Sequence, residues 1–150
     1  MSGNKHWTIR AVSNAGAALA FERQGEALFV NGAQAAEISP VEYLLIATAG
    51  CLALSCRAVL RDGHRSGSSV EVTALGSKAA EPPSRLGRID LVVRLGSEID
   101  AVEAASIVQK AKKLCTVTNT LLGSVAIQIH SSNGVESRPE EGQEDQLAER

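Results

Sequence analysis

The stretch from residue 39 to residue 56, SPVEYLLIATAGCLALSC, constrains the fold most, because a strong helix start leads into an almost wholly apolar run. Ser39 suits the N-cap, Pro40 suits the first helical position, and Glu42, three residues after Ser39, completes a capping box. The sequence therefore predicts a helix that begins at Pro40. Apolar residues then fall on every side of the helix as far as Leu60, which predicts that it is buried all round.

Strand patterns precede and follow this helix. The alternation of apolar and polar residues over 88–95 puts Ile89, Leu91, Val93 and Leu95 on one face, with Asp90 and Arg94 on the other. Together with a strand predicted over 70–78, this strand is predicted to form a half-exposed hairpin. Further strands are predicted over 5–12 and 19–30, the second interrupted by a QGE turn, and over 125–130.

A second helix is predicted to open at Asp100 and to run along an alanine-rich stripe to the KKLC sequence that ends at Cys115. The predicted order is β-β-β-α-β-β-α-β, which is an α+β fold with an antiparallel sheet wrapping a buried central helix. One sheet of a 150-residue chain covers a helix of this kind poorly. We therefore expect a homodimer that buries the helix between two chains.

The length of the chain fits one domain, which we place at residues 1–133. The net charge of −2 is unevenly spread, since residues 136–150 hold six acidic side chains against two arginines. Residues 134–150 are polar and acidic, and we expect them to form a disordered or loosely attached tail.

Several classes of function find no support in the composition. With 3% aromatic residues the chain lacks stacking platforms for single-stranded nucleic acid. The N-terminus lacks the apolar stretch of a signal peptide, and the longest apolar run, 44–54, is too short to span a bilayer, so we expect a cytoplasmic protein that binds no membrane. The three histidines are scattered and no cysteines have zinc-site spacing, so neither a metal nor a cofactor is expected.

Three cysteines are the chemically notable residues. From the chain alone, Cys51 is best interpreted as a small core residue of the buried helix. Cys56 lies about 140° further round that helix, cannot form a disulfide with Cys51 there, and is also predicted to be core. Cys115 follows Lys112 and Lys113, whose charge favours a thiolate, but a packing role is equally open.

The segments SPVEYLLIATAGCLAL and AKKLCTVTNTLL, each with one cysteine and separated by a hairpin, resemble the OsmC/Ohr superfamily of osmotically induced and organic-hydroperoxide-resistance proteins. The resemblance implies an intertwined homodimer with two active sites at the subunit interface. It also implies a thiol peroxidase acting on organic hydroperoxides, with Cys51 as the peroxidatic thiol and Cys115 as the resolving thiol. An external dithiol would then restore the pair.

One position departs from that family pattern. The peroxidases of the family place a glutamate directly after the helix-starting proline, where it helps hold an arginine that activates the thiol, and this chain has Val41 there. Glu42 lies about 180° from Cys51 around the helix and is better explained as a capping residue. Arg10 and Arg23 are candidates for the activating arginine by region alone.

Two other functions stay open at this point. In the first, the same dimer binds a small apolar or acyl ligand and its thiols are unreactive because Val41 has replaced the acid. In the second, a reactive thiol serves a reaction other than peroxide reduction, which the sequence does not separate from peroxidase chemistry.

Overall fold

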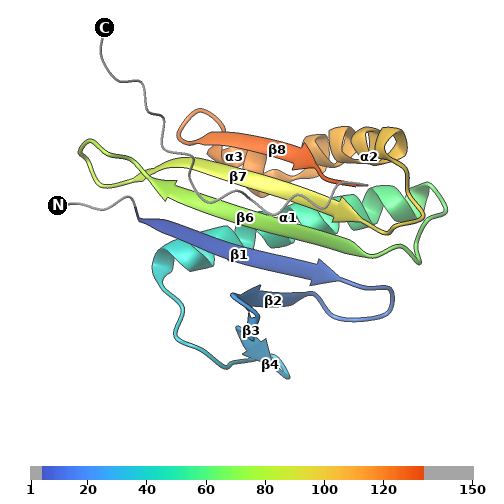
Figure 1. Ribbon diagram of the computed structural model, residues 1–150, viewed down its shortest axis with the longest axis horizontal. Helices are drawn as coiled ribbons and strands as arrows, with labels where there is room; N and C mark the ends of the chain where they lie inside the picture. Colours follow the sequence, from blue (N-terminus) through green and yellow to red (C-terminus); the bar gives the residue numbers. More distant parts are fainter. Residues whose placement is uncertain (1–4, 134–150) are drawn as a thin grey trace, which may run out of the picture.

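The computed structural model describes residues 5–133, and the predicted acidic tail lies outside this range. The α+β class is confirmed. In chain order the elements are β1 His6–Ser13, β2 Ala20–Arg23, β3 Glu26–Ala27, β4 Phe29–Val30, β5 Ala33–Gln34, α1 Pro40–Asp62, β6 Val70–Lys78, β7 Leu86–Leu95, α2 Ala101–Leu114, α3 Thr116–Leu121 and β8 Ala126–Ser131 (Figure 1).

Six strands form the main sheet, in the order β3-β2-β1-β6-β7-β8, and β4 pairs with β5 in a separate small hairpin. All neighbours in the main sheet are antiparallel except β7 and β8, which are parallel. Helices α2 and α3 connect these two strands, and a parallel pair requires such a crossover. The sheet is therefore mixed, whereas an antiparallel sheet was predicted.

The β6–β7 hairpin has the two faces that its sequence predicts. Ile89, Leu91 and Val93 are completely buried, whereas Arg94 is exposed and Asp90 is half-buried. The strands are aligned so that Val72 pairs with Val93 and Ala74 with Leu91. Side chains alternate across a strand, so one face of the hairpin supplies the core.

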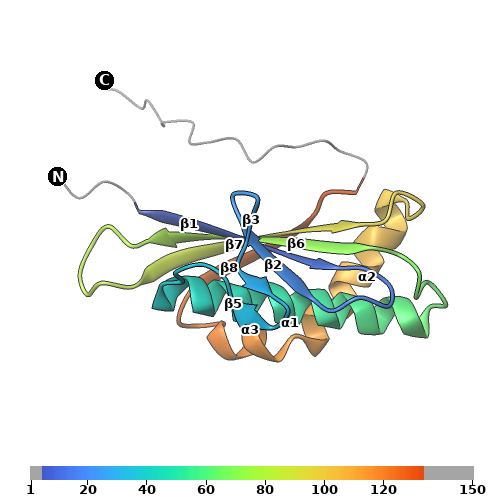
Figure 2. The same ribbon diagram turned by 90° about the horizontal axis from the view of Figure 1, so that it is seen from below.

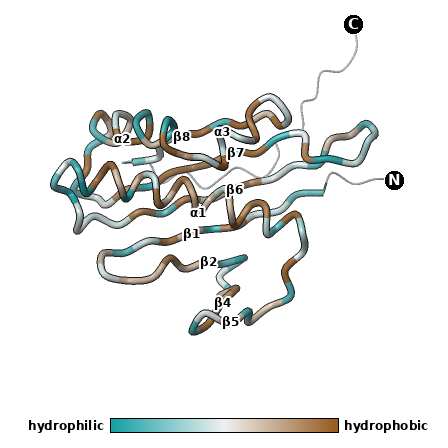
Figure 3. The backbone as a smooth tube through the Cα atoms, turned by 180° about the vertical axis from the view of Figure 1, so that it is seen from behind, coloured by the Kyte–Doolittle hydropathy of each residue, from teal (hydrophilic) through white to brown (hydrophobic). Residues whose placement is uncertain are grey.

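All three helices cover the same face of the sheet (Figure 2). Helix α1 lies against β1 and β6 and also contacts α2 and α3, and hydrophobic residues recur along it and along the neighbouring strands (Figure 3). The opposite face of the sheet carries charged side chains. There Arg10 forms ion pairs with Glu22 at 2.6 Å and with Glu71 at 2.7 Å, from strands on either side of it.

Helix α1 begins where predicted. Ser39 Oγ accepts a hydrogen bond from the Glu42 amide, and the Glu42 carboxylate accepts one from the Ser39 amide, so the predicted capping box is confirmed. At the other end, the Gly63 amide donates to the Val59 carbonyl at 3.0 Å. These bonds satisfy polar groups that a helix end otherwise leaves without partners.

One chain by itself buries only part of this helix, and its complete burial in a homodimer stays a prediction. Leu45, Ala49, Leu52 and Cys56 are completely buried, but Leu54 remains 55% exposed and Tyr43 44% exposed. The sheet and the two shorter helices surround only part of the helix, so one side is left uncovered.

Helix α1 is long enough and apolar enough to cross a membrane, judged by length and composition alone. More than half of its most apolar window is buried inside the chain. It is packed as the core helix of this fold.

Candidate thiol site

Cys51 lies midway along α1, on the edge of the uncovered side, and is half-buried. The residue before it, Gly50, allows the segment around β2 to approach closely. A Cβ atom at Gly50 would lie 2.9 Å from Phe21 Cζ and 3.3 Å from Leu19 Cδ2. The absence of a side chain at Gly50 therefore lets two apolar residues pack against the helix at the position before Cys51.

Cys115 lies at the break between α2 and α3 and is completely buried. Its amide donates to the Ala111 carbonyl at 3.0 Å, which ends α2. Its carbonyl accepts hydrogen bonds from the Asn119 amide and the Thr118 hydroxyl, both at 3.1 Å, as α3 begins. The cysteine backbone is thus fixed by both helices.

The fold brings Cys51 and Cys115 together although they are far apart in the sequence. Burial raises the pKa of the Cys115 thiol, hydrogen bonds from the Thr118 hydroxyl and amide oppose this rise, and the neighbouring Cys51 thiol adds to it. Both cysteines are free thiols. A second thiol beside the first is the arrangement that allows a sulfenic acid to be converted into a disulfide.

Cys56 is completely buried among core residues, as predicted. Burial raises its pKa to about 12, and the nearby Cys115 contributes to the rise. Only the thiolate is nucleophilic, so Cys56 is an inert thiol at neutral pH.

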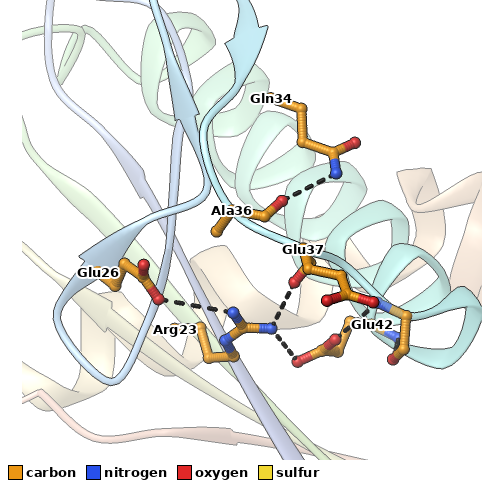
Figure 4. Close-up of polar contacts among 7 residues, drawn as sticks. Arg23, Glu26, Gln34, Ala36, Glu37 and Glu42 are labelled. Carbon is orange, nitrogen blue, oxygen red and sulfur yellow. Dashed lines mark hydrogen bonds and ion pairs between the residues drawn. The ribbon is translucent and has the colours of Figure 1, made fainter.

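Arg23, at the end of β2, reaches the first turn of α1 (Figure 4). Its Nη1 atom donates to Glu42 Oε1 at 2.8 Å and to the Glu37 carbonyl at 2.9 Å, and its Nη2 atom lies 3.5 Å from Glu26 Oε2. One guanidinium therefore ties β2, β3 and the segment before α1 to the start of the helix.

Glu42 is buried and uses both carboxylate oxygens. Burial by itself raises the pKa of Glu42, but hydrogen bonds from Arg23 and Ser39 outweigh it, so that the pKa is lowered from its usual value. The sequence identified the capping role of Glu42 but not its pairing with Arg23, because nothing local indicates which side chain of the N-terminal strands reaches it.

The two arginines considered as activating groups lie in different places. Arg10 alternates with the buried Ile9 and Ala11 along β1, so it lies on the face of the sheet away from the core, where it pairs with Glu22 and Glu71. Arg23 is bound at the start of α1, and Cys51 follows Glu42 by nine residues, which is about 13 Å along the helix axis. Within residues 5–133, neither arginine forms a hydrogen bond with Cys51.

Three solved structures share this fold at low sequence identity. An organic hydroperoxide resistance protein, OhrB of Bacillus subtilis, is 16% identical with a TM-score of 0.57, covering 86% of this chain and 97% of its own. An organic hydroperoxide resistance protein OsmC, described as a predicted redox protein, from Legionella pneumophila is 18% identical with a TM-score of 0.57, covering 87% and 97%. A third, an organic hydroperoxide resistance protein from Elizabethkingia anophelis, is 13% identical with a TM-score of 0.54, covering 89% and 97%.

No curated protein matches the sequence. The family model described as OsmC-like protein matches residues 32–130, which is about two thirds of the chain and includes both Cys51 and Cys115. On this match and the shared fold, the chain belongs to the OsmC-like protein family.

Proposed function

We propose that the protein is a cysteine-based peroxidase that reduces organic hydroperoxides. The Cys51 thiolate attacks the terminal peroxide oxygen, the O–O bond breaks, and the alcohol leaves with a proton. The resulting Cys51 sulfenic acid condenses with the Cys115 thiol, which forms a disulfide and releases water. An external dithiol then reduces the disulfide by thiol exchange.

The observation that carries this proposal is the proximity of the two thiols. Cys51 is half-buried and so open to a small substrate. Cys115 is buried beside it, and Cys51 contributes to raising the pKa of the Cys115 thiol. Phe21 and Leu19, which pack against the helix at the adjacent Gly50, supply apolar side chains near the site, which favours an alkyl hydroperoxide over hydrogen peroxide. Structural relatives whose names record organic hydroperoxide resistance point the same way.

The working form that we propose is a homodimer formed through the uncovered side of α1. Leu44, Ala47, Cys51, Leu54 and Ala58 follow one another at spacings of three and four residues, which places them in one stripe along the helix. All five are exposed or half-buried in the single chain. Spacing of this kind suits close packing of two helices, and it would place Cys51 at the interface.

A second function is favoured by the residues at the start of α1. Val41 stands where the peroxidases of the family have an acid, and Arg23 is engaged by Glu42 rather than by the thiol. A dimer with weakly activated thiols would bind a small apolar or acyl ligand without reacting. Peroxide chemistry separates the two functions directly.

The test is intact-mass analysis of the reduced protein after treatment with a slight excess of cumene hydroperoxide. We expect a loss of two hydrogens for the native chain and for Cys56→Ser, with the disulfide mapped between Cys51 and Cys115. Cys115→Ser should gain one oxygen or become over-oxidised at Cys51, and Cys51→Ser should stay unchanged.

The peroxidase proposal fails if the native chain keeps its mass and all its thiols under these conditions. It also fails if Cys51→Ser consumes hydroperoxide as fast as the native chain. Cys56→Ser is the matched control, because it removes a thiol from the same helix on the side that faces the sheet.

A further inference from the structure

A small cavity lies at the end of the molecule where β1 starts, β6 ends and α1 begins. Its volume is about 260 Å³, and its lining comes from four separate segments: Lys5, Trp7, Val41, Lys78, Ser84, Arg85 and Leu86. The start of β1, the β6–β7 turn and the start of α1 lie together at this end (Figures 1 and 2). Val41 precedes Cys51 by ten residues, so the cavity lies about 15 Å along the helix axis from the thiol.

The wall of the cavity is apolar. Leu86 is buried, and Trp7 and Val41 are half-buried. Trp7 is the single tryptophan of the chain. Partly covered aromatic and aliphatic side chains of this kind bury an apolar ligand body.

The rim of the cavity is cationic. The Lys78 amide, at the end of β6, donates to the carbonyl of Lys5, just before β1, at 3.1 Å, so the two lysines lie next to each other. Lys5 Nζ lies 5.3 Å from the centre of the Trp7 ring, which holds this charge over the apolar wall. Arg85 stands on the third side.

The charges of the rim are only partly neutralised. Arg85 forms an ion pair with Glu81 at 2.6 Å and also donates to the Glu81 and Pro83 carbonyls. Neither Lys5 nor Lys78 forms an ion pair with any acidic side chain of residues 5–133. An anion placed between these two lysines would gain two partners without displacing an acid.

We propose that this cavity binds a small carboxylate with an apolar body, such as a medium-chain acyl carboxylate. The lysines would hold the carboxylate, and Trp7, Val41 and Leu86 would cover the chain. At roughly 30 Å³ for each water molecule, the volume corresponds to about nine waters, which fits a ligand of about that many heavy atoms. The site is separate from the thiols and does not depend on the peroxidase proposal.

The single tryptophan provides the readout. Octanoate, titrated below its micelle concentration into the full chain, should change the Trp7 fluorescence spectrum saturably, and calorimetry should give the same affinity. Octan-1-ol has the chain without the charge and acetate has the charge without the chain. Each should bind roughly tenfold more weakly or worse, since both kinds of contact contribute.

Lys5→Gln/Lys78→Gln should weaken octanoate binding by about tenfold or more, because it removes the two rim charges that pair with no acidic side chain of residues 5–133. Lys110→Gln/Lys113→Gln, which removes two exposed lysines of α2, is the matched control and should bind as the native chain does. Circular dichroism verifies folding, and Lys78→Gln alone serves if the double variant is unstable. Cys51→Ser should bind octanoate normally, which keeps this test independent of the peroxidase test.

Three results would overturn the site: no saturable signal by either method, octan-1-ol binding as tightly as octanoate, or equal affinity in the variants lacking Lys5 or Lys78 and in the control.

Discussion

The two sides of helix α1 differ more than its sequence suggests. On the side that faces the sheet, Leu45, Ala49, Leu52 and Cys56 have no contact with solvent, whereas on the opposite side Tyr43 and Leu54 are about half exposed. Both sides are apolar. The difference teaches that apolar residues on every side of a helix need not all be buried by the same chain: this chain covers one side and leaves the other exposed.

The largest expected difference between the two sides concerns their cysteines. With iodoacetamide at pH 8, Cys51 should be alkylated first and Cys56 at least about a hundredfold more slowly. A buried thiol with a pKa of about 12 is thiolate to only about one part in 10⁴ at that pH. Peptide mapping after timed quenching measures the two rates. Equal rates would mean that the two sides are equally open.

The next largest effect should come from Leu52, which is completely buried. Leu52→Ala is expected to lower the free energy of unfolding by about 2–5 kcal/mol, because it leaves a cavity between helix and sheet. Urea unfolding at a fixed protein concentration measures the change. A loss below about 1 kcal/mol would contradict the packing described for this side.

Within the first turn, Glu42 and Tyr43 provide a smaller contrast. Glu42→Gln is expected to lower the free energy of unfolding by about 1–3 kcal/mol at pH 7, because the half-buried Arg23 loses a charged acceptor. Tyr43→Phe, on the exposed side, should change it by at most about 0.5 kcal/mol.

The effect of Glu42 should also depend on pH. Since the folded state lowers the pKa of Glu42, its contribution is present above the unfolded pKa of about 4.3 and is lost as the pH falls through the lower folded value. The native chain and Glu42→Gln should therefore converge in stability on acidification. A difference that stays constant between pH 7 and pH 3 would exclude the ion pair as its source.

The smallest effect on the fold of one chain is expected at Leu54. Leu54→Arg should leave the circular dichroism spectrum unchanged, since this side chain is more than half exposed. Light scattering should nevertheless show a mass half that of the native protein, because two charges would meet in the proposed helix stripe. A native mass for the variant would contradict the proposed dimer contact through this stripe. Lys110→Arg, on an exposed part of α2, is the control.

Local signals predicted a large part of this fold. The start of α1 at Pro40 and the two faces of the β6–β7 hairpin follow from residues close in sequence, and both are confirmed. The parallel pairing of β8 with β7 was not predicted, because the direction of a final strand depends on how α2 and α3 cross the sheet. Strand patterns specify which residues face the core but not which strands become neighbours.

The candidate site was predictable only in part. The two cysteines were identified from the sequence and the family resemblance. The effect of Cys51 on the pKa of Cys115 depends on the packing of α3 against α1. The pairing of Arg23 with Glu42 requires the path of the N-terminal strands, which the sequence did not give in detail. The cavity lined by Trp7 and Val41 could not be predicted either, since its four segments meet only in the folded chain.

The charged outer face of the sheet, where Arg10 links Glu22 and Glu71, limits how this protein can assemble. All three helices lie on the other face, and the apolar strip of α1 on that face is the surface through which we propose that two copies meet. A strip that packs against the same strip of a second copy across a two-fold axis is fully buried by that one contact. Growth would then stop at two copies, with ionic surfaces outermost, and the same polarity would oppose stacking into fibres.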